Sequence, residues 1–184
     1  MSAGAGNSYD RLMSERRRTL FLAALLPLSG CLQRKPKLPA PDIGVPALLQ
    51  SAKPSFASLK EYRGQVFVLE FWATWCGPCV ELLPHMNKMV AAFAGKPVHF
   101  ISITDESREA VEKFVKTHPM KAEIGLDPEE AAFRAFHVRS RPEVFVIDPY
   151  GRVWIKVHPS FLYQSDIQEA LNAPPPADQI SLNK

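Results

Sequence analysis

The sequence predicts an α/β domain in which helices cover both faces of a central mixed sheet. Three runs of apolar, β-forming residues, at positions 66–71, 98–103 and 144–147, are typical of strands buried on both faces. Helical patterns separate these runs, and the alternation of strand and helix favours parallel pairing. Residues 148–151 have the sequence Asp-Pro-Tyr-Gly of a type I turn, which should lead into an antiparallel strand at 153–157.

Four helices are expected around this sheet. The first should begin near Cys76 and end before Gly95, and the second should cover about residues 107–117. Near the second helix we expect a solvated charged face made of Asp105, Glu106, Arg108, Glu109, Glu112 and Lys113.

The start of each remaining helix is predicted from its capping residues. For the third helix, Asp127 should be the N-cap, with Pro128 at the first helical position and Glu130 three residues after the cap. The fourth should begin at Ser165, with Gln168 completing a capping box.

Size and composition predict one globular domain with appendages. The chain has 184 residues, of which 46 % are hydrophobic and 22 % are charged. The net charge is +3, but residues 1–30 carry four basic and two acidic residues, so the remainder is close to neutral. A nearly neutral domain has no electrostatic footprint for nucleic acid, and we expect no such partner.

Residues 1–30 predict a secretion signal. Three arginines at 16–18 precede an apolar run at 20–26, and small residues follow up to Cys31. The run is shorter than the roughly 20 residues of a membrane-spanning helix. The alternatives are a short hydrophobic helix docked on the domain, or a membrane anchor with one buried cysteine.

Residues 28–31, Leu-Ser-Gly-Cys, resemble the lipobox of bacterial lipoproteins. This resemblance implies that Cys31 is acylated and becomes the first mature residue, which places the protein outside the cytoplasm on a membrane. Residues 17–21 resemble the twin-arginine export signal without its lysine, so the export route stays open.

The compact domain is expected between two irregular segments. Residues 31–46 contain four prolines and predict a tether, and residues 174–184 begin with three prolines and predict a loose tail. The domain should therefore cover residues 47–173.

Cys76 and Cys79 carry the predicted chemistry. They form a C-x-x-C pair where the first buried strand gives way to a helix. Free amides at a helix N-terminus favour a thiolate, so Cys76 should be the nucleophile and Cys79 the resolving thiol. Gly77 would let a partner chain approach, and Pro78 has no amide hydrogen to leave unbonded.

Two structural interpretations of Cys76 and Cys79 are alternatives to a redox-active pair. Half of a zinc site would need two further ligands at close spacing, and the histidines form no such pair. They are His85, His99, His118, His137 and His158. A purely structural disulfide is a poor alternative because so small a loop restricts the unfolded chain little.

The segment around the cysteines resembles the thioredoxin superfamily, and the resemblance covers most of residues 47–173. Residues 75–79, Trp-Cys-Gly-Pro-Cys, match the thioredoxin active-site motif in full, and Pro84 resembles the proline that kinks its helix. Arg141 and Pro142 resemble the loop whose cis proline faces the disulfide. The alternative for Pro142 is an ordinary trans peptide, since only about 5–6 % of X-Pro bonds are cis.

Within that superfamily the chain resembles the TlpA/ResA group of membrane-tethered thioredoxins. The leader, residues 71–76 and an extra strand-helix unit before Pro142 carry this resemblance. It implies no cofactor beyond the Cys76–Cys79 disulfide, a monomer, protein disulfide clients such as apocytochrome c, and a membrane thiol electron donor. The implied substrate-binding residues are Trp75, Gly77, Pro78, Arg141 and Pro142. Arg141 is a bulky charge where the family more often has a small or apolar residue.

Glu70 is the one charged residue in a buried-strand pattern and lies six residues before Cys76. In thioredoxin an acidic residue at the matching place moves the proton of the resolving thiol. Burial should raise the carboxyl pKa toward neutrality. The alternative is that Glu70 reaches solvent at the end of the sheet. Trp72 and Trp75 should pack around the disulfide, and His85 should be a solvated surface residue.

Three functional classes remain. The first is a protein-disulfide reductase using Cys76 and Cys79. The second is a thiol peroxidase, which needs an upstream proline that residues 66–76 lack. The third is a non-enzymatic copper or zinc carrier.

Overall fold

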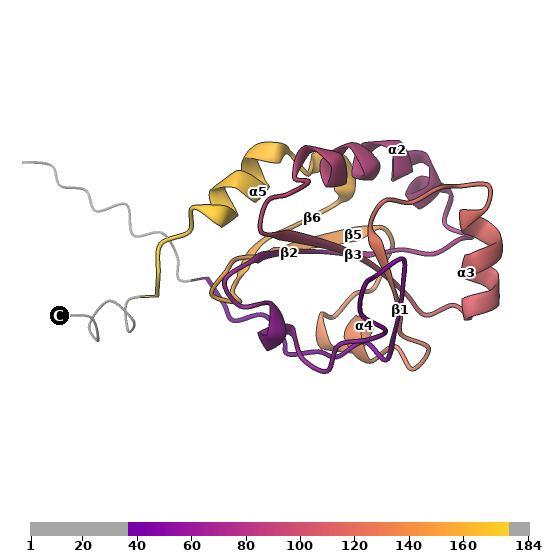
Figure 1. Ribbon diagram of the computed structural model, residues 1–184, viewed down its shortest axis with the longest axis horizontal. Coiled ribbons are helices and arrows are strands. Elements are labelled where there is room, and N and C mark those ends of the chain that lie inside the picture. The colour runs from indigo at the N-terminus through magenta and orange to yellow at the C-terminus, as the bar shows by residue number, and fades with distance from the viewer. Residues whose placement is uncertain (1–36, 177–184) are drawn as a thin grey trace, which may run out of the picture. The chain divides into compact units, whose positions relative to one another are not determined.

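Six strands form one mixed sheet in the computed structural model, which describes residues 37–176 (Figure 1). In chain order the elements are β1 (Ala47–Leu49), η1 (Leu59–Tyr62), β2 (Val66–Phe71), α2 (Gly77–Ala92), β3 (Val98–Thr104), α3 (Arg108–Val115), β4 (Glu123–Leu126), α4 (Ala131–Ala135), β5 (Glu143–Ile147), β6 (Val153–Val157), η2 (Pro159–Phe161) and α5 (Gln164–Leu171). Helices lie on both faces of the sheet, as predicted, with α2 and α5 on one face and α4 on the other.

The sheet order is β1-β4-β3-β2-β5-β6. β2 pairs in parallel with β3 and antiparallel with β5, and β6 forms the predicted antiparallel edge. β1 and β4, which are three and four residues long, were not predicted from the sequence. Gly125 interrupts the apolar pattern of β4, but a Cβ there would come within 3.0 Å of the Ile103 side chain, so close packing favours glycine.

Side chains of β2 alternate between two hydrophobic clusters. Phe67, Leu69 and Phe71 belong to a cluster that includes Phe133 and Phe136 around α4. Val66 and Val68 belong to the cluster that contains Met86 and Met89 of α2 and Ile167 and Ala170 of α5. Because successive side chains of a strand point to opposite faces, Glu70 lies on the same face as Val66 and Val68, beneath α2.

The two helix starts predicted from caps are shifted in the structure. α4 begins at Ala131 rather than at Pro128, because Glu130 adopts a left-handed conformation (φ 54°). α5 begins at Gln164 rather than at Ser165, and Asp166 rather than Gln168 bonds the start, accepting from the Tyr163 amide at 2.8 Å. Local capping patterns locate a helix end only to within a few residues.

The first two helices and the turn agree with the predictions. α2 and α3 occupy the expected ranges, and Ser107 caps α3 by accepting from the Ala110 amide. In the turn, the Gly151 amide donates to the Asp148 carbonyl at 2.8 Å.

Residues 39–46 are part of the domain, which corrects the prediction of a tether from 31 to 46. Ile43 and Val45 are buried in the core, and Val45 forms an antiparallel bridge with Phe56. The Ala40 amide donates to the Gly151 carbonyl at 2.9 Å. Prolines prevent a regular element here, but the apolar side chains between them still gain from burial.

Several predictions concern residues outside the described part of the chain. They are the signal at 1–30, the lipidation site Cys31, residues 31–36 of the tether and residues 177–184 of the tail. Residues 174–176 have neither helix nor strand. Between residues 37 and 176 we find no helix with the length and apolarity needed to cross a membrane.

Candidate active site

Cys76 lies at the N-terminus of α2, where it is the N-cap residue. It forms a disulfide with Cys79, and its Sγ accepts a hydrogen bond from the Cys79 amide at 3.3 Å. Pro78 lies in the first turn, where it removes an amide that would have no helical partner. The predicted placement of the sulfurs at a helix start is confirmed. An amide donor and the helix dipole both favour negative charge on Cys76 Sγ.

The disulfide lies just below the surface. Cys79 is 1 % exposed and Cys76 is 5 % exposed. Around Cys76 the surface is formed by Trp75, which is 70 % exposed, and by Gly77 and Pro78, which are also exposed. A Cβ at Gly77 would meet no atom within 4 Å, so another chain can lie against this position.

The Arg141–Pro142 peptide bond is cis, as predicted. Pro142 immediately precedes β5, whose first residue Glu143 pairs with Phe71 at the end of β2. The cysteine loop leaves the sheet at that same end of β2. The topology therefore brings the cis-proline loop and the cysteine loop to one edge of the sheet.

Arg141 packs between two aromatic rings and pairs with a carboxylate. Its guanidinium carbon lies 5.4 Å from the Trp75 ring centre and 4.4 Å from that of Phe133. Its Nη2 donates to Asp105 Oδ2 at 2.7 Å, and the two side chains are only 14 % and 22 % exposed. This neutralising partner allows a bulky charge beside the cis proline. A cavity of about 240 Å³ adjoins the site and is lined by Trp75, Phe133, Val138, Arg139, Ser140 and Arg141.

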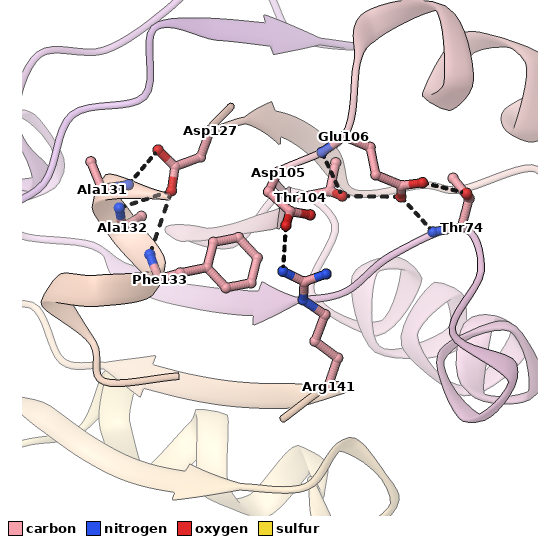
Figure 2. A network of polar contacts seen from close by, with 9 residues as sticks. All are labelled: Thr74, Thr104, Asp105, Glu106, Asp127, Ala131, Ala132, Phe133 and Arg141. Atoms are coloured by element: carbon pink, nitrogen blue, oxygen red, sulfur yellow. Dashed lines mark hydrogen bonds and ion pairs between the residues drawn. The ribbon is translucent and has the colours of Figure 1, made fainter. Parts of the chain in front are cut away.

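Glu106 belongs to the site, although its sequence context predicted a solvated helix face. Its carboxylate accepts from the Thr74 amide and from Thr74 Oγ1, both at 2.6 Å (Figure 2). Asp105 was also predicted to lie on that solvated face, but its side chain is only 22 % exposed and bonds Arg141. Both residues precede α3 and follow β3 directly, so they lie at the sheet edge from which the cysteine loop leaves. That position after a buried strand was the signal available in the sequence.

Glu70 is buried beneath α2, so the alternative that it reaches solvent is wrong. It is 2 % exposed, and its Oε2 accepts from Ser102 Oγ at 2.6 Å. Desolvation raises the pKa of Glu70 to about 7, and the Ser102 hydrogen bond opposes this rise. The side chain can therefore gain or lose a proton near neutral pH.

Two aromatic residues and a histidine complete the surroundings. Trp72 is 1 % exposed and packs in one cluster with Cys76 and Cys79, as expected. Trp75 instead projects into solvent. His85 is half-buried, and its Nε2 lies 3.1 Å from the Leu162 carbonyl, so the prediction of a purely solvated residue was wrong. This contact joins α2 to the segment before α5.

Fold and site together define a thioredoxin-like protein that carries a C-x-x-C disulfide at a helix N-terminus. Comparison with known families then identifies the family. The chain belongs to the AhpC/TSA family, whose model matches residues 36–155.

Named relatives agree with this class. A segment covering 52 % of this chain is 34 % identical to the thiol-disulfide oxidoreductase ResA of Bacillus thuringiensis subsp. konkukian and spans 56 % of that protein. ResA of Bacillus subtilis is 30 % identical over 65 % of this chain and 67 % of its own length. Among solved structures, a thiol:disulfide interchange protein DsbE from Chlorobium tepidum superposes with a TM-score of 0.63 at 27 % identity, covering 73 % of this chain and 96 % of its own.

Proposed function

We propose that this protein is a thiol-disulfide oxidoreductase that reduces protein disulfides outside the cytoplasm. The observation that carries the proposal is the Cys76–Cys79 disulfide at the start of α2, at the same sheet edge as the cis-Pro142 loop. The names of the ResA and DsbE relatives support the same chemistry.

The proposed cycle starts from the reduced protein. The Cys76 thiolate attacks one sulfur of a client disulfide, which forms a mixed disulfide and releases the first client thiolate. Cys79, as a thiolate, then attacks Cys76 Sγ. This step releases the second client thiolate and leaves the Cys76–Cys79 disulfide, so two electrons pass from the protein to the client. No cofactor is needed beyond the two sulfurs.

Glu70 is proposed as the group that takes the proton of Cys79 during resolution. It lies under α2, on the side of the sheet that faces the helix carrying Cys79. Its pKa of about 7 suits a group that both accepts and returns a proton.

The client should bind across the exposed rim of the site. Trp75, Gly77 and Pro78 provide the surface beside Cys76, and the backbone around Pro142 provides pairing for an extended peptide. Arg141 forms one wall of the adjoining cavity, where its charge is already paired with Asp105. This wall would select client side chains that pack on a guanidinium and an indole ring.

A location on the outer side of a membrane completes the proposal. The lipobox at Cys31 would anchor the protein, and a membrane thiol carrier would return electrons to Cys76 and Cys79 after each cycle. Apocytochrome c is the proposed client, acted on by one monomer. These points rest on the leader sequence and on the resemblance to the TlpA/ResA group.

A trapping experiment tests the function. In Cys79→Ser the resolving thiol is absent, so mixed disulfides through Cys76 should accumulate in the host cell and disappear on reduction. The double variant Cys76→Ser/Cys79→Ser is the control. Apocytochrome among the trapped proteins supports the maturation role, and a broad mixture of clients contradicts it. Peroxide consumption by the wild type that outpaces disulfide reduction would overturn the reductase assignment.

A further inference from the structure

Two adjacent carboxylates connect the loops on either side of the disulfide. Glu106 bonds Thr74 in the cysteine loop, and Asp105 bonds Arg141 in the cis-proline loop (Figure 2). The Arg141 guanidinium in turn lies over the ring of Trp75, the neighbour of Thr74. The contacts therefore close into a ring that passes through both loops.

Glu106 is held in one orientation because both of its oxygens are used. Oε1 accepts from Thr74 Oγ1 at 2.6 Å, and Oε2 accepts from the Thr74 amide at 2.6 Å and from Thr104 Oγ1 at 3.2 Å. Thr74 lies two residues before Cys76. Because one of these bonds comes from a backbone amide, Glu106 fixes the position of the chain just before the nucleophile Cys76.

Asp105 acts on the opposite loop. Its Oδ2 accepts from Arg141 Nη2 at 2.7 Å, and Arg141 is joined to Pro142 by the cis peptide. Low exposure of both side chains strengthens this pair relative to a surface ion pair. Asp105 therefore holds the residue that precedes the peptide-binding backbone.

We propose that Asp105 and Glu106 are positioning residues that set the nucleophile and the peptide-binding loop in register for attack on a client disulfide. Glu106 governs the rate of attack by Cys76, and Asp105 governs binding of the client. The inference rests on the proposed function, because it requires a client bound beside Pro142. The two residues are adjacent in the short segment between β3 and α3, so one segment of the chain contacts both loops.

Single-turnover kinetics of the reduced protein separate the two roles. The rate of oxidation is followed against the concentration of a short oxidised dicysteine peptide, and separately with dithiodipyridine, a small uncharged disulfide. Glu106→Ala should lower the limiting rate about tenfold or more with both disulfides, because Cys76 is misplaced for any attack. Glu106→Gln should recover most of this rate, since its amide oxygen can accept from the Thr74 amide and its NH₂ can donate to Thr74 Oγ1.

Asp105→Ala should act mainly on binding. We expect the half-saturation concentration for the peptide to rise about tenfold, with a smaller change in the limiting rate. Asp105→Asn should recover binding, because one oxygen suffices to accept from Arg141. Glu109→Ala, which removes the same charge from the exposed side of α3, is the matched control and should behave as wild type.

The outcomes distinguish this inference from the proposed function. If the wild type shows no saturation with the peptide, peptide binding beside Pro142 is wrong, while the Glu106 variants with dithiodipyridine still test placement of Cys76. If the wild type saturates and the alanine variants match it, the positioning role is wrong. The positioning role would also be wrong if Glu106→Ala and Asp105→Ala lost equally in limiting rate and in half-saturation concentration, and if both losses followed an equal loss of folding stability. Glu106→Gln and Asp105→Asn remove the negative charge but keep an acceptor oxygen. If these variants recover rate and binding, the hydrogen bonds and not the charges carry the positioning role.

Discussion

Glu70 is the residue whose chemistry depends most on its surroundings. The side chain is almost wholly removed from water, and Ser102 supplies its one described hydrogen bond within residues 37–176. A single neutral donor compensates little of the cost of burying a carboxylate, so the protonated form gains and the pKa rises to about 7. Desolvation of the Glu70 carboxylate lowers the stability of the fold at high pH. The same raised pKa would let Glu70 act as both an acid and a base in the active site.

Glu70→Gln should change how the stability of the oxidised protein depends on pH. The folded pKa of about 7 lies above the ordinary value of 4.5, so the folded state binds the proton more tightly. Wild-type stability should therefore fall as pH rises from about 4.5 to 7, by on the order of 3 kcal/mol. The variant lacks this loss. In urea unfolding at about pH 4 and pH 8, the free energy of unfolding of Glu70→Gln relative to the wild type should therefore increase from the lower to the higher pH.

Ser102→Ala provides the control for this measurement. Removing the hydrogen bond takes away the influence that lowers the pKa of Glu70, so the fall in stability should extend to higher pH. A difference between Glu70→Gln and the wild type that is the same at both pH values would contradict titration of the buried carboxyl. An unchanged pH dependence of insulin disulfide reduction in Glu70→Gln would contradict the proton-transfer role.

At the scale of elements, α4 depends on a residue that lies outside it. Glu130, at the N-cap position, makes no side-chain cap, and the carboxylate of Asp127 accepts from the Ala131, Ala132 and Phe133 amides instead. Figure 2 shows Asp127 directed at these amides. Because Phe133 packs against Arg141, this cap also supports the wall of the cis-proline loop.

Asp127→Ala should destabilise the protein by about 2 kcal/mol, because it leaves three amides at the start of α4 without their acceptor. Asp127→Asn keeps one acceptor oxygen and should lose less. Urea unfolding of both variants at neutral pH measures the difference. If Asp127→Ala were as stable as the wild type, the prediction would be wrong, because water would then satisfy the three amides as well as the carboxylate does.

At the scale of the molecule, the packing of residues 39–46 shortens the proposed tether. Pro39 already forms a bridge with Arg152 next to β6, so seven residues (32–38) separate Cys31 from the domain, instead of the fifteen (32–46) before the predicted domain start at residue 47. A fully extended chain from Cys31 to Pro39 reaches at most roughly 28 Å. A lipid at Cys31 would thus keep the domain close to the membrane surface, where a membrane electron donor could reach the disulfide.

Cys31→Ala tests the anchor. We expect the wild type to sediment with membranes and to need detergent for release, and the variant to stay in the soluble fraction because it lacks the acylated thiol. Fractionation followed by immunoblotting measures the distribution. Retention of the variant on membranes would contradict anchoring through Cys31, and release of the wild type by salt alone would contradict acylation.

The sequence alone determined those features whose cause is local. Runs of β-forming residues predicted the central strands, the C-x-x-C pair after a strand predicted the disulfide at the start of α2, and Glu70 in an apolar run predicted a buried acid. Short strands were missed because three or four residues carry too little periodicity, as β1 and β4 show.

Tertiary structure decided which distant residues serve the site. Glu106 lies 32 residues from Thr74, and Asp105 lies 36 residues from Arg141. No local pattern links these pairs, and on sequence alone both acids suited a solvated helix face. They meet because β2, β3 and β5 are neighbours in the sheet and bring the loops at one edge together. Strand pairing is set by burial of the whole sheet, so it lies beyond what any single segment of the chain can indicate.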